Sequence, residues 1–167
     1  VINEEEKAVA IQAQKTLRIA VKTLSYLRKG LNEQSAKVVC DIIHKETHTS
    51  AVAMTNLTET LAQIGDNPNP TRINQLALNQ IAYSINSFNN KKDTDYHIIN
   101  CEEIGCSHTA VLAPLKQRGE TIGTLIFYFR SEKEITPVII KLVSGLGSLL
   151  SNQLEMAEAD RSYQLAK

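Results

Sequence analysis

Two cysteines and a histidine lie close together in the sequence and are the residues best suited to chemistry. Cys101, Cys106 and His108 have the spacing Cys-x4-Cys-x-His, and thiolates with an imidazole can bind zinc or a similar metal. A closed zinc site needs a fourth ligand, which His97 or Glu102 would have to supply. The same side chains could instead contact a bound ligand or act through a thiol. A loop held by ordinary packing is the alternative to all of these.

Catalytic motifs are otherwise absent from the sequence. A cysteine nucleophile requires a histidine base within hydrogen-bond reach, and Cys106 and His108, two residues apart, share one side of an extended strand without being brought into contact. There is no G-x-S-x-G, H-E-x-x-H or P-loop motif and no kinase nucleotide-binding signature. Cys40 falls on the apolar face of a predicted helix, which indicates a small buried hydrophobic residue.

The composition is that of a soluble globular protein, and three cysteines without a disulfide-framework spacing favour a reducing cytosol. The 167 residues are enough for one domain with a real core. The 18 basic and 18 acidic residues cancel, so the chain lacks the basic excess expected of a nucleic-acid-binding protein. No apolar run approaches the roughly 18 residues that cross a bilayer. The acidic start argues against a signal peptide, and the missing initiator methionine indicates a piece of a longer chain.

Hydrophobic periodicity predicts an antiparallel sheet with helices around it. Gly119 supplies the positive φ of a tight hairpin between the last two strands. Thr136 and Pro137 begin the last helix as cap and first-turn residue. Gly145 and Gly147 inside that helix indicate close packing there. Strands are expected at 51–55, 60–64, 96–99, 109–115 and 121–129, and helices at 4–29, from Asn32, at 70–88 and from Thr136.

The two terminal helices have apolar residues at the spacing of helix pairing. In the first helix the steps alternate between three and four residues, as in a coiled coil. This pattern fits a helix that lies on its own domain and equally a parallel dimer helix. The last helix has an apolar stripe from Ile139 to Leu154. The predicted dimer interface consists of Ala10, Ala13, Leu17, Ala20, Leu24, Leu27, Leu142, Leu146 and Leu149.

Several stretches of the chain resemble the cytoplasmic GAF domain of LytS-type bacterial sensor histidine kinases. They are TLSYLRKGLNEQSA, EEIGCSHTAVLAPLKQRGETIGTLIFYFRSEKEITP and LGSLLSNQLEMAEADR, and the resemblance is strongest from Glu102 to Glu158. It implies an α+β fold (an α/β sandwich), with a central, mainly antiparallel sheet of five to six strands between helices. It also implies an N-terminal signalling and dimer helix at 1–31, a GAF core at 32–135 and an output helix at 136–167.

The resemblance implies a non-catalytic sensory relay domain of a membrane two-component kinase, at the cytoplasmic face of the bacterial membrane. The implied partners are a second copy, an upstream membrane-spanning domain, a downstream kinase domain and a response regulator. The family's phosphoacceptor histidine stands in an Asn-Pro-His-Phe setting, which no histidine here has, so this chain should not autophosphorylate. The alternative is a free-standing GAF-type thiol enzyme, similar to a methionine-sulfoxide reductase, that uses Cys101 or Cys106.

The family also suggests where a small-molecule ligand would bind. In GAF folds the ligand lies between the sheet and a variable segment, here residues 66–108. Family members often have a further cysteine after the histidine, whereas here His108 is followed directly by Thr109, which weighs against a metal. No cofactor is assigned, and the ligand's identity is left open. The predicted ligand contacts are Arg72, Tyr96, Cys106, His108, Leu125 and Phe127.

Overall fold

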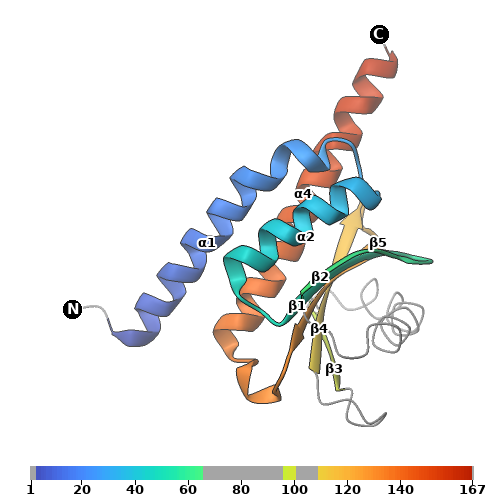
Figure 1. The fold of residues 1–167 in the computed structure, drawn as a ribbon. Helices are drawn as coiled ribbons and strands as arrows, with labels where there is room; N and C mark the ends of the chain where they lie inside the picture. Colours follow the sequence, from blue (N-terminus) through green and yellow to red (C-terminus); the bar gives the residue numbers. More distant parts are fainter. Residues whose placement is uncertain (1–2, 66–95, 101–108, 167) are drawn as a thin grey trace.

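The computed structural model of the chain describes residues 3–65, 96–100 and 109–166. Within them a five-stranded sheet has the strand order β2-β1-β5-β4-β3, with every neighbouring pair antiparallel. Helices α2 and α4 cover one face of it, and α1 packs against these two helices on the same side (Figure 1). This confirms the predicted α+β fold, while the helix predicted at 70–88 lies outside the described residues. The elements are α1 (Glu4–Leu27), α2 (Glu33–Thr47), β1 (Ala51–Asn56), β2 (Thr60–Gly65), β3 (His97–Asn100), β4 (Thr109–Gln117), β5 (Glu120–Phe129), the 3-10 helix η2 (Glu132–Glu134) and α4 (Pro137–Ala166).

The two faces of the sheet have different surroundings. Residues that alternate along each strand point to opposite faces. One set packs with the helices into a single core cluster, which includes Val52, Val111 and Phe127. The opposite set is also buried, and its members are Ala51, Ala53, Thr55, Ala110, Leu112, Thr124, Ile126 and Tyr128. Because both faces are buried, β4 and β5 have nearly continuous apolar sequences.

Local sequence signals set the β4–β5 turn and the starts of α2 and α4 where the sequence predicted them. Arg118 and Gly119 form the β4–β5 turn with φ angles of 55° and 79°, as a two-residue hairpin turn requires. The Asn32 side chain accepts from the Ser35 N–H at 3.0 Å in a capping box, and Thr136 Oγ1 accepts from the Ile139 N–H at 3.3 Å. These contacts confirm the predicted hairpin and both predicted caps.

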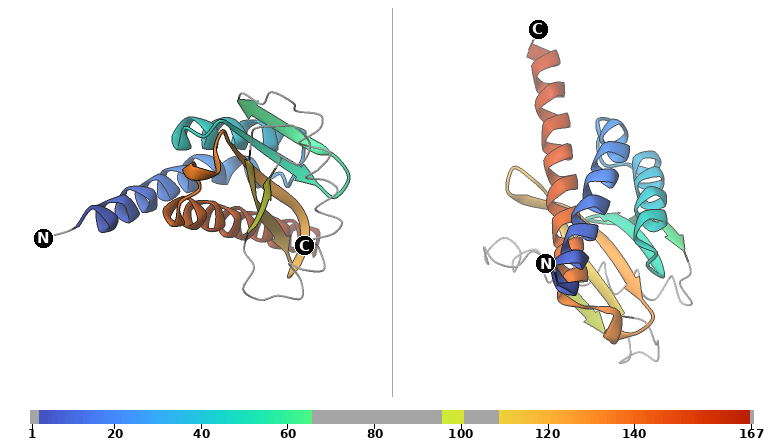
Figure 2. Two further views of the ribbon diagram at one scale, coloured as in Figure 1. Left: turned by 90° about the horizontal axis from the view of Figure 1, so that it is seen from below. Right: turned by 90° about the vertical axis from the view of Figure 1, so that its left-hand side faces the viewer.

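The terminal helices α1 and α4 lie side by side and run in the same direction (Figures 1 and 2). Gln12 on α1 lines a groove together with Lys141 on α4, and Thr23, further along α1, contacts Gln153, further along α4. The C-terminal part of α4 projects beyond the sheet (Figure 1). Within the described ranges, neither of these helices nor α2 has the length and hydrophobicity of a membrane span.

Helix α1 packs on its own domain with a different face from the one predicted to form the seam. Ile19, Thr23 and Leu27 are its buried residues, whereas Ala10, Ala13 and Leu17 are exposed and Ala20 and Leu24 are half-buried. Neighbouring positions on a helix are about 100° apart, so the two faces lie beside each other. The apolar stripe predicted from the sequence is therefore mostly left open.

Three residues were wrongly assigned to the predicted dimer interface. Leu27, Leu142 and Leu146 are at most 3% exposed and belong to the chain's own core. Leu149 is half-buried against the same core. The physical reason is that the stripe of α4 covers β4 and meets α1 at the same time, which uses its central leucines within one chain.

Candidate functional site

The residues predicted to do chemistry fall mostly outside the described part of the chain. This holds for Arg72, Cys101, Cys106 and His108, so the predictions about them stay predictions. Tyr96 is described, and it is half-buried against the core cluster. Among residues 3–65, 96–100 and 109–166, no group of three or more metal-binding side chains is present.

Leu125 and Phe127, two of the predicted ligand contacts, belong to the core cluster, and their role as ligand contacts stays a prediction. Both are fully buried in the core between the sheet and the helices. The opposite face of β5 carries Thr124, Ile126 and Tyr128 instead. There the hydroxyls of Thr55 and Thr124 lie 2.7 Å apart and are buried. The run of apolar residues in β5 gives no sign of which set faces the helices.

The tip of the β4–β5 hairpin makes polar contacts with α4, and we call this set of contacts the hairpin clamp. The Lys116 N–H donates to Ser151 Oγ at 2.9 Å, and Gln117 Nε2 donates to the Leu154 carbonyl at 3.3 Å. A groove of about 210 Å³ remains beside these contacts. Polar contacts rather than dense apolar packing therefore join this part of the hairpin to α4.

The turn residue Arg118 completes the hairpin clamp. Its backbone N–H donates to Glu155 Oε1 at 3.3 Å, and its guanidinium lies 2.8 Å from Glu158 Oε1. Because the Arg118 side chain is 72% exposed, the ion pair contributes less than about 1 kcal/mol. The left-handed conformation of Arg118 turns its backbone toward α4, so turn geometry and helix contact depend on each other.

A buried polar contact holds the same segment of α4 on the side of α1. Gln153, which is 6% exposed, donates through Nε2 to the Ala20 carbonyl at 3.2 Å. Thr23 Oγ1 lies 2.8 Å from the Ile19 carbonyl and 3.2 Å from Gln153 Oε1. A buried polar pair in a helix seam favours one register, because a shifted register leaves its groups unpaired. Residues 151–158 of α4 are thus held by two different elements.

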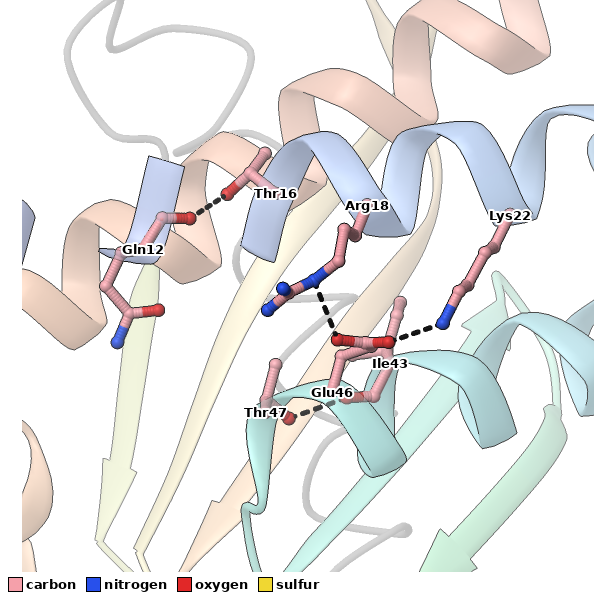
Figure 3. Close-up of polar contacts among 7 residues, drawn as sticks. All are labelled: Gln12, Thr16, Arg18, Lys22, Ile43, Glu46 and Thr47. Carbon is pink, nitrogen blue, oxygen red and sulfur yellow. Dashed lines mark hydrogen bonds and ion pairs between the residues drawn. The ribbon is translucent and has the colours of Figure 1, made fainter. Parts of the chain in front are cut away.

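An acidic residue joins α1 to α2. Glu46 on α2 accepts from Lys22 Nζ at 2.6 Å and lies 3.4 Å from Arg18 Nε (Figure 3). The hydrogen bond from Lys22, with the charges of both bases, holds the pKa of Glu46 below its usual value. The resulting stabilisation is present above the unfolded-state pKa and is lost as the pH falls through the folded-state pKa.

Cys40 is fully buried in the core, as predicted for a small hydrophobic residue. Burial raises the pKa of its thiol, because the apolar surroundings disfavour the thiolate. Cys40 is therefore unsuited to nucleophilic chemistry.

Comparisons with known proteins identify the chain's family and its fold. No protein-family model matches the chain. It is 37% identical over 169 residues to the sensor protein LytS of Bacillus anthracis, covering 99% of this chain and 28% of that protein. It is 37% identical over 171 residues to LytS of Bacillus subtilis, covering 100% and 28%. The chain thus spans less than a third of these relatives.

Solved structures supply the fold. The GAF domain of a putative sensor histidine kinase from Pseudomonas syringae pv. tomato matches 91% of this chain and 93% of that one, with a TM-score of 0.57 and 15% identity. The structure described as "A. Aeolicus nlh2 gaf domain in an inactive state" matches 90% of this chain and 99% of that one, with a TM-score of 0.56 and 14% identity. The chain is a GAF domain of the LytS family. The thiol-enzyme alternative gains no support from these relatives.

The contacts that hold α4 in this LytS-type GAF domain are ones that the sequence did not reveal. Ser151, Glu155 and Glu158 recur at helical spacing, but such residues usually face solvent. Gln153 gives a clearer signal, because it interrupts the apolar stripe between Leu150 and Leu154. A polar residue at that position predicts a buried partner.

Proposed function

We propose that this GAF domain is a non-catalytic relay module of a dimeric membrane sensor histidine kinase. Helix α1 receives a signal from an upstream membrane-spanning domain, and α4 passes it to a downstream kinase domain that acts with a response regulator. The domain lies at the cytoplasmic face of the bacterial membrane. The relatives support this proposal, since they are named LytS sensor proteins, and one from Staphylococcus aureus is named a sensor histidine kinase/phosphatase.

One observation is central to the relay proposal: residues 151–158 of α4 are held both by the hairpin clamp and by α1. A movement of the sheet or of α1 changes the contacts that α4 makes. A signal shifts such an equilibrium only when it favours one arrangement over the other. The parallel course of α1 and α4 suits this role, because displacement along one helix is transmitted to its neighbour.

Removing the Ser151 hydroxyl tests the relay. In the full-length sensor, Ser151→Ala removes the hydroxyl that accepts from the Lys116 N–H and weakens the hairpin clamp by about 1 kcal/mol. We expect the basal autophosphorylation rate to change at least about fivefold, since coupling energies of this size correspond to such factors. The measurement is autophosphorylation of the sensor in membranes with and without its activating stimulus.

Ser148→Ala is the matched control, because Ser148 is exposed and lies one turn earlier on the same helix. It should leave the basal rate unchanged. Wild-type rates and an unaltered response in Ser151→Ala would contradict the relay proposal.

We further propose that the domain self-associates through the open apolar stripe on α1, formed by Ala10, Ala13, Leu17, Ala20 and Leu24. Leu17 is 67% exposed, and the neighbouring Val21 is 80% exposed. Burial of these apolar side chains against a second copy would remove them from water and so favour association. The exposed face lies beside the face that meets α4, so a second copy can pack there without disturbing the fold.

A charge on the stripe should weaken self-association. Leu17→Glu places an unpaired carboxylate at the centre of the proposed interface, and we expect the dissociation constant to rise at least about tenfold, or 1.4 kcal/mol. Ile11→Glu is the matched control, because Ile11 is also exposed but lies about 120° around the helix. Sedimentation equilibrium of the chain measures both. A wild-type chain that stays monomeric at all accessible concentrations would count against the interface.

A further inference from the structure

Helix α1 has two halves that differ in how they are held. In the anchored half, residues 18–27, Ile19 and Leu27 are fully buried, and two basic side chains pair with Glu46. In the overhanging half, residues 4–16, no position is fully buried, although the structure describes all of them. The overhanging half extends away from the body of the domain (Figure 2).

The contact between the overhanging half and α4 is loosely packed. A groove of about 150 Å³ lies between the two helices there, and Gln12, Thr16 and Leu142 are among the residues that line it. The Thr16 hydroxyl donates to the Gln12 carbonyl at 2.9 Å, within α1 (Figure 3). That hydrogen bond therefore adds nothing between the two helices.

Gln12 also leaves a polar atom unpaired at this contact. Its Oε1 is buried and has no hydrogen-bond partner, and a buried acceptor of this kind opposes the packing that buries it. The anchored half shows the contrast, since Thr23 and Gln153 satisfy each other across the seam. One end of the α1–α4 seam is therefore fixed and the other is kept weak.

We propose that the overhanging half of α1 is a lever that swings about the anchored half, and that Gln12 keeps it free to move. Opening the weak end breaks few apolar contacts and exposes Oε1 to water, so it costs far less than global unfolding. The fixed end then transmits the swing to Gln153, within the segment that the hairpin clamp holds. The swing of the lever does not depend on the proposed function, whereas its use as the signal input rests on that function.

Hydrogen exchange of the chain tests the lever. Gln12→Leu removes the unpaired acceptor and fills part of the groove, so we expect the amides of residues 9–16 to exchange at least about fivefold more slowly. The amides of the anchored half should not change. Gln14→Leu is the matched control, because Gln14 is exposed on the same turn and gains the same helix propensity. If exchange arose only from fraying of the helix end, both variants would slow it equally.

The lever is overturned if Gln12→Leu leaves exchange at 9–16 unchanged, or if both leucine variants slow it equally. The role of the lever as the signal input is tested separately in the full-length sensor. There Gln12→Leu should reduce the change in autophosphorylation between stimulated and unstimulated states. Slower exchange with an unaltered kinase response would support the lever and contradict its role in signalling.

Discussion

Replacing Gly123 with alanine should lower the free energy of unfolding by about 3 kcal/mol. Gly123 lies in β5 between Asn56 of β1 and Leu115 of β4. An added Cβ would overlap the Thr55 carbonyl oxygen and lie 3.1 Å from Leu31 Cδ2. The overlap is with backbone, so no rotation of a side chain can relieve it, and β1 and β5 would have to separate beside the buried Thr55.

Urea unfolding of the chain, followed by circular dichroism, measures this effect. Gly119→Asn is the control, because nothing lies within 4 Å of a Cβ built at Gly119 and asparagine tolerates its positive φ. We expect the control to change the unfolding free energy by less than about 1 kcal/mol. An equally small change for Gly123→Ala would mean that β1 does not approach β5 as closely as the structure has it.

Features with a local cause could be predicted from the sequence. The hairpin turn follows from Gly119, and the start of α4 follows from Thr136 and Pro137, because these residues act on the backbone beside them. The strands were also predicted close to their observed bounds. Such signals do not depend on which distant segment packs against them.

The choice between two equivalent faces could not be predicted. In β5 both alternating sets are apolar, so the sequence does not say that Phe127 rather than Ile126 meets the helices. In α1 an apolar stripe through Leu17 looked like the packing face, yet the helix buries Ile19 and Thr23. A period fixes which residues share a face, but not which face has a partner.

The site was missed because its contacts join segments far apart in the sequence. The hairpin clamp links Arg118 to Glu155 and Glu158, and the seam links Thr23 to Gln153. Each of these residues has an ordinary role when taken alone, as an exposed charge or a helical polar residue. Only the fold brings them together on one segment of α4.

Two glycines on α4 should respond in opposite ways to the same substitution. A Cβ at Gly147 would lie 2.7 Å from the Ala113 Cβ and 3.4 Å from the Pro114 carbonyl. Gly147→Ala should therefore push α4 away from β4 and cost about 1–3 kcal/mol. A Cβ at Gly145 meets nothing within 4 Å, so Gly145→Ala should stabilise the chain by about 1 kcal/mol through helix propensity alone.

The pair isolates the helix–sheet contact, because both substitutions gain the same helix propensity and lie two residues apart. Their difference in unfolding free energy, from matched urea titrations, should be about 2 kcal/mol or more. In the full-length sensor Gly147→Ala should also shift basal autophosphorylation, since Ser151 follows one turn later and loses its alignment with the Lys116 N–H. Equal stabilisation by both alanines would show that α4 does not lie against β4 at Gly147, and the hairpin clamp would then lose its geometric basis.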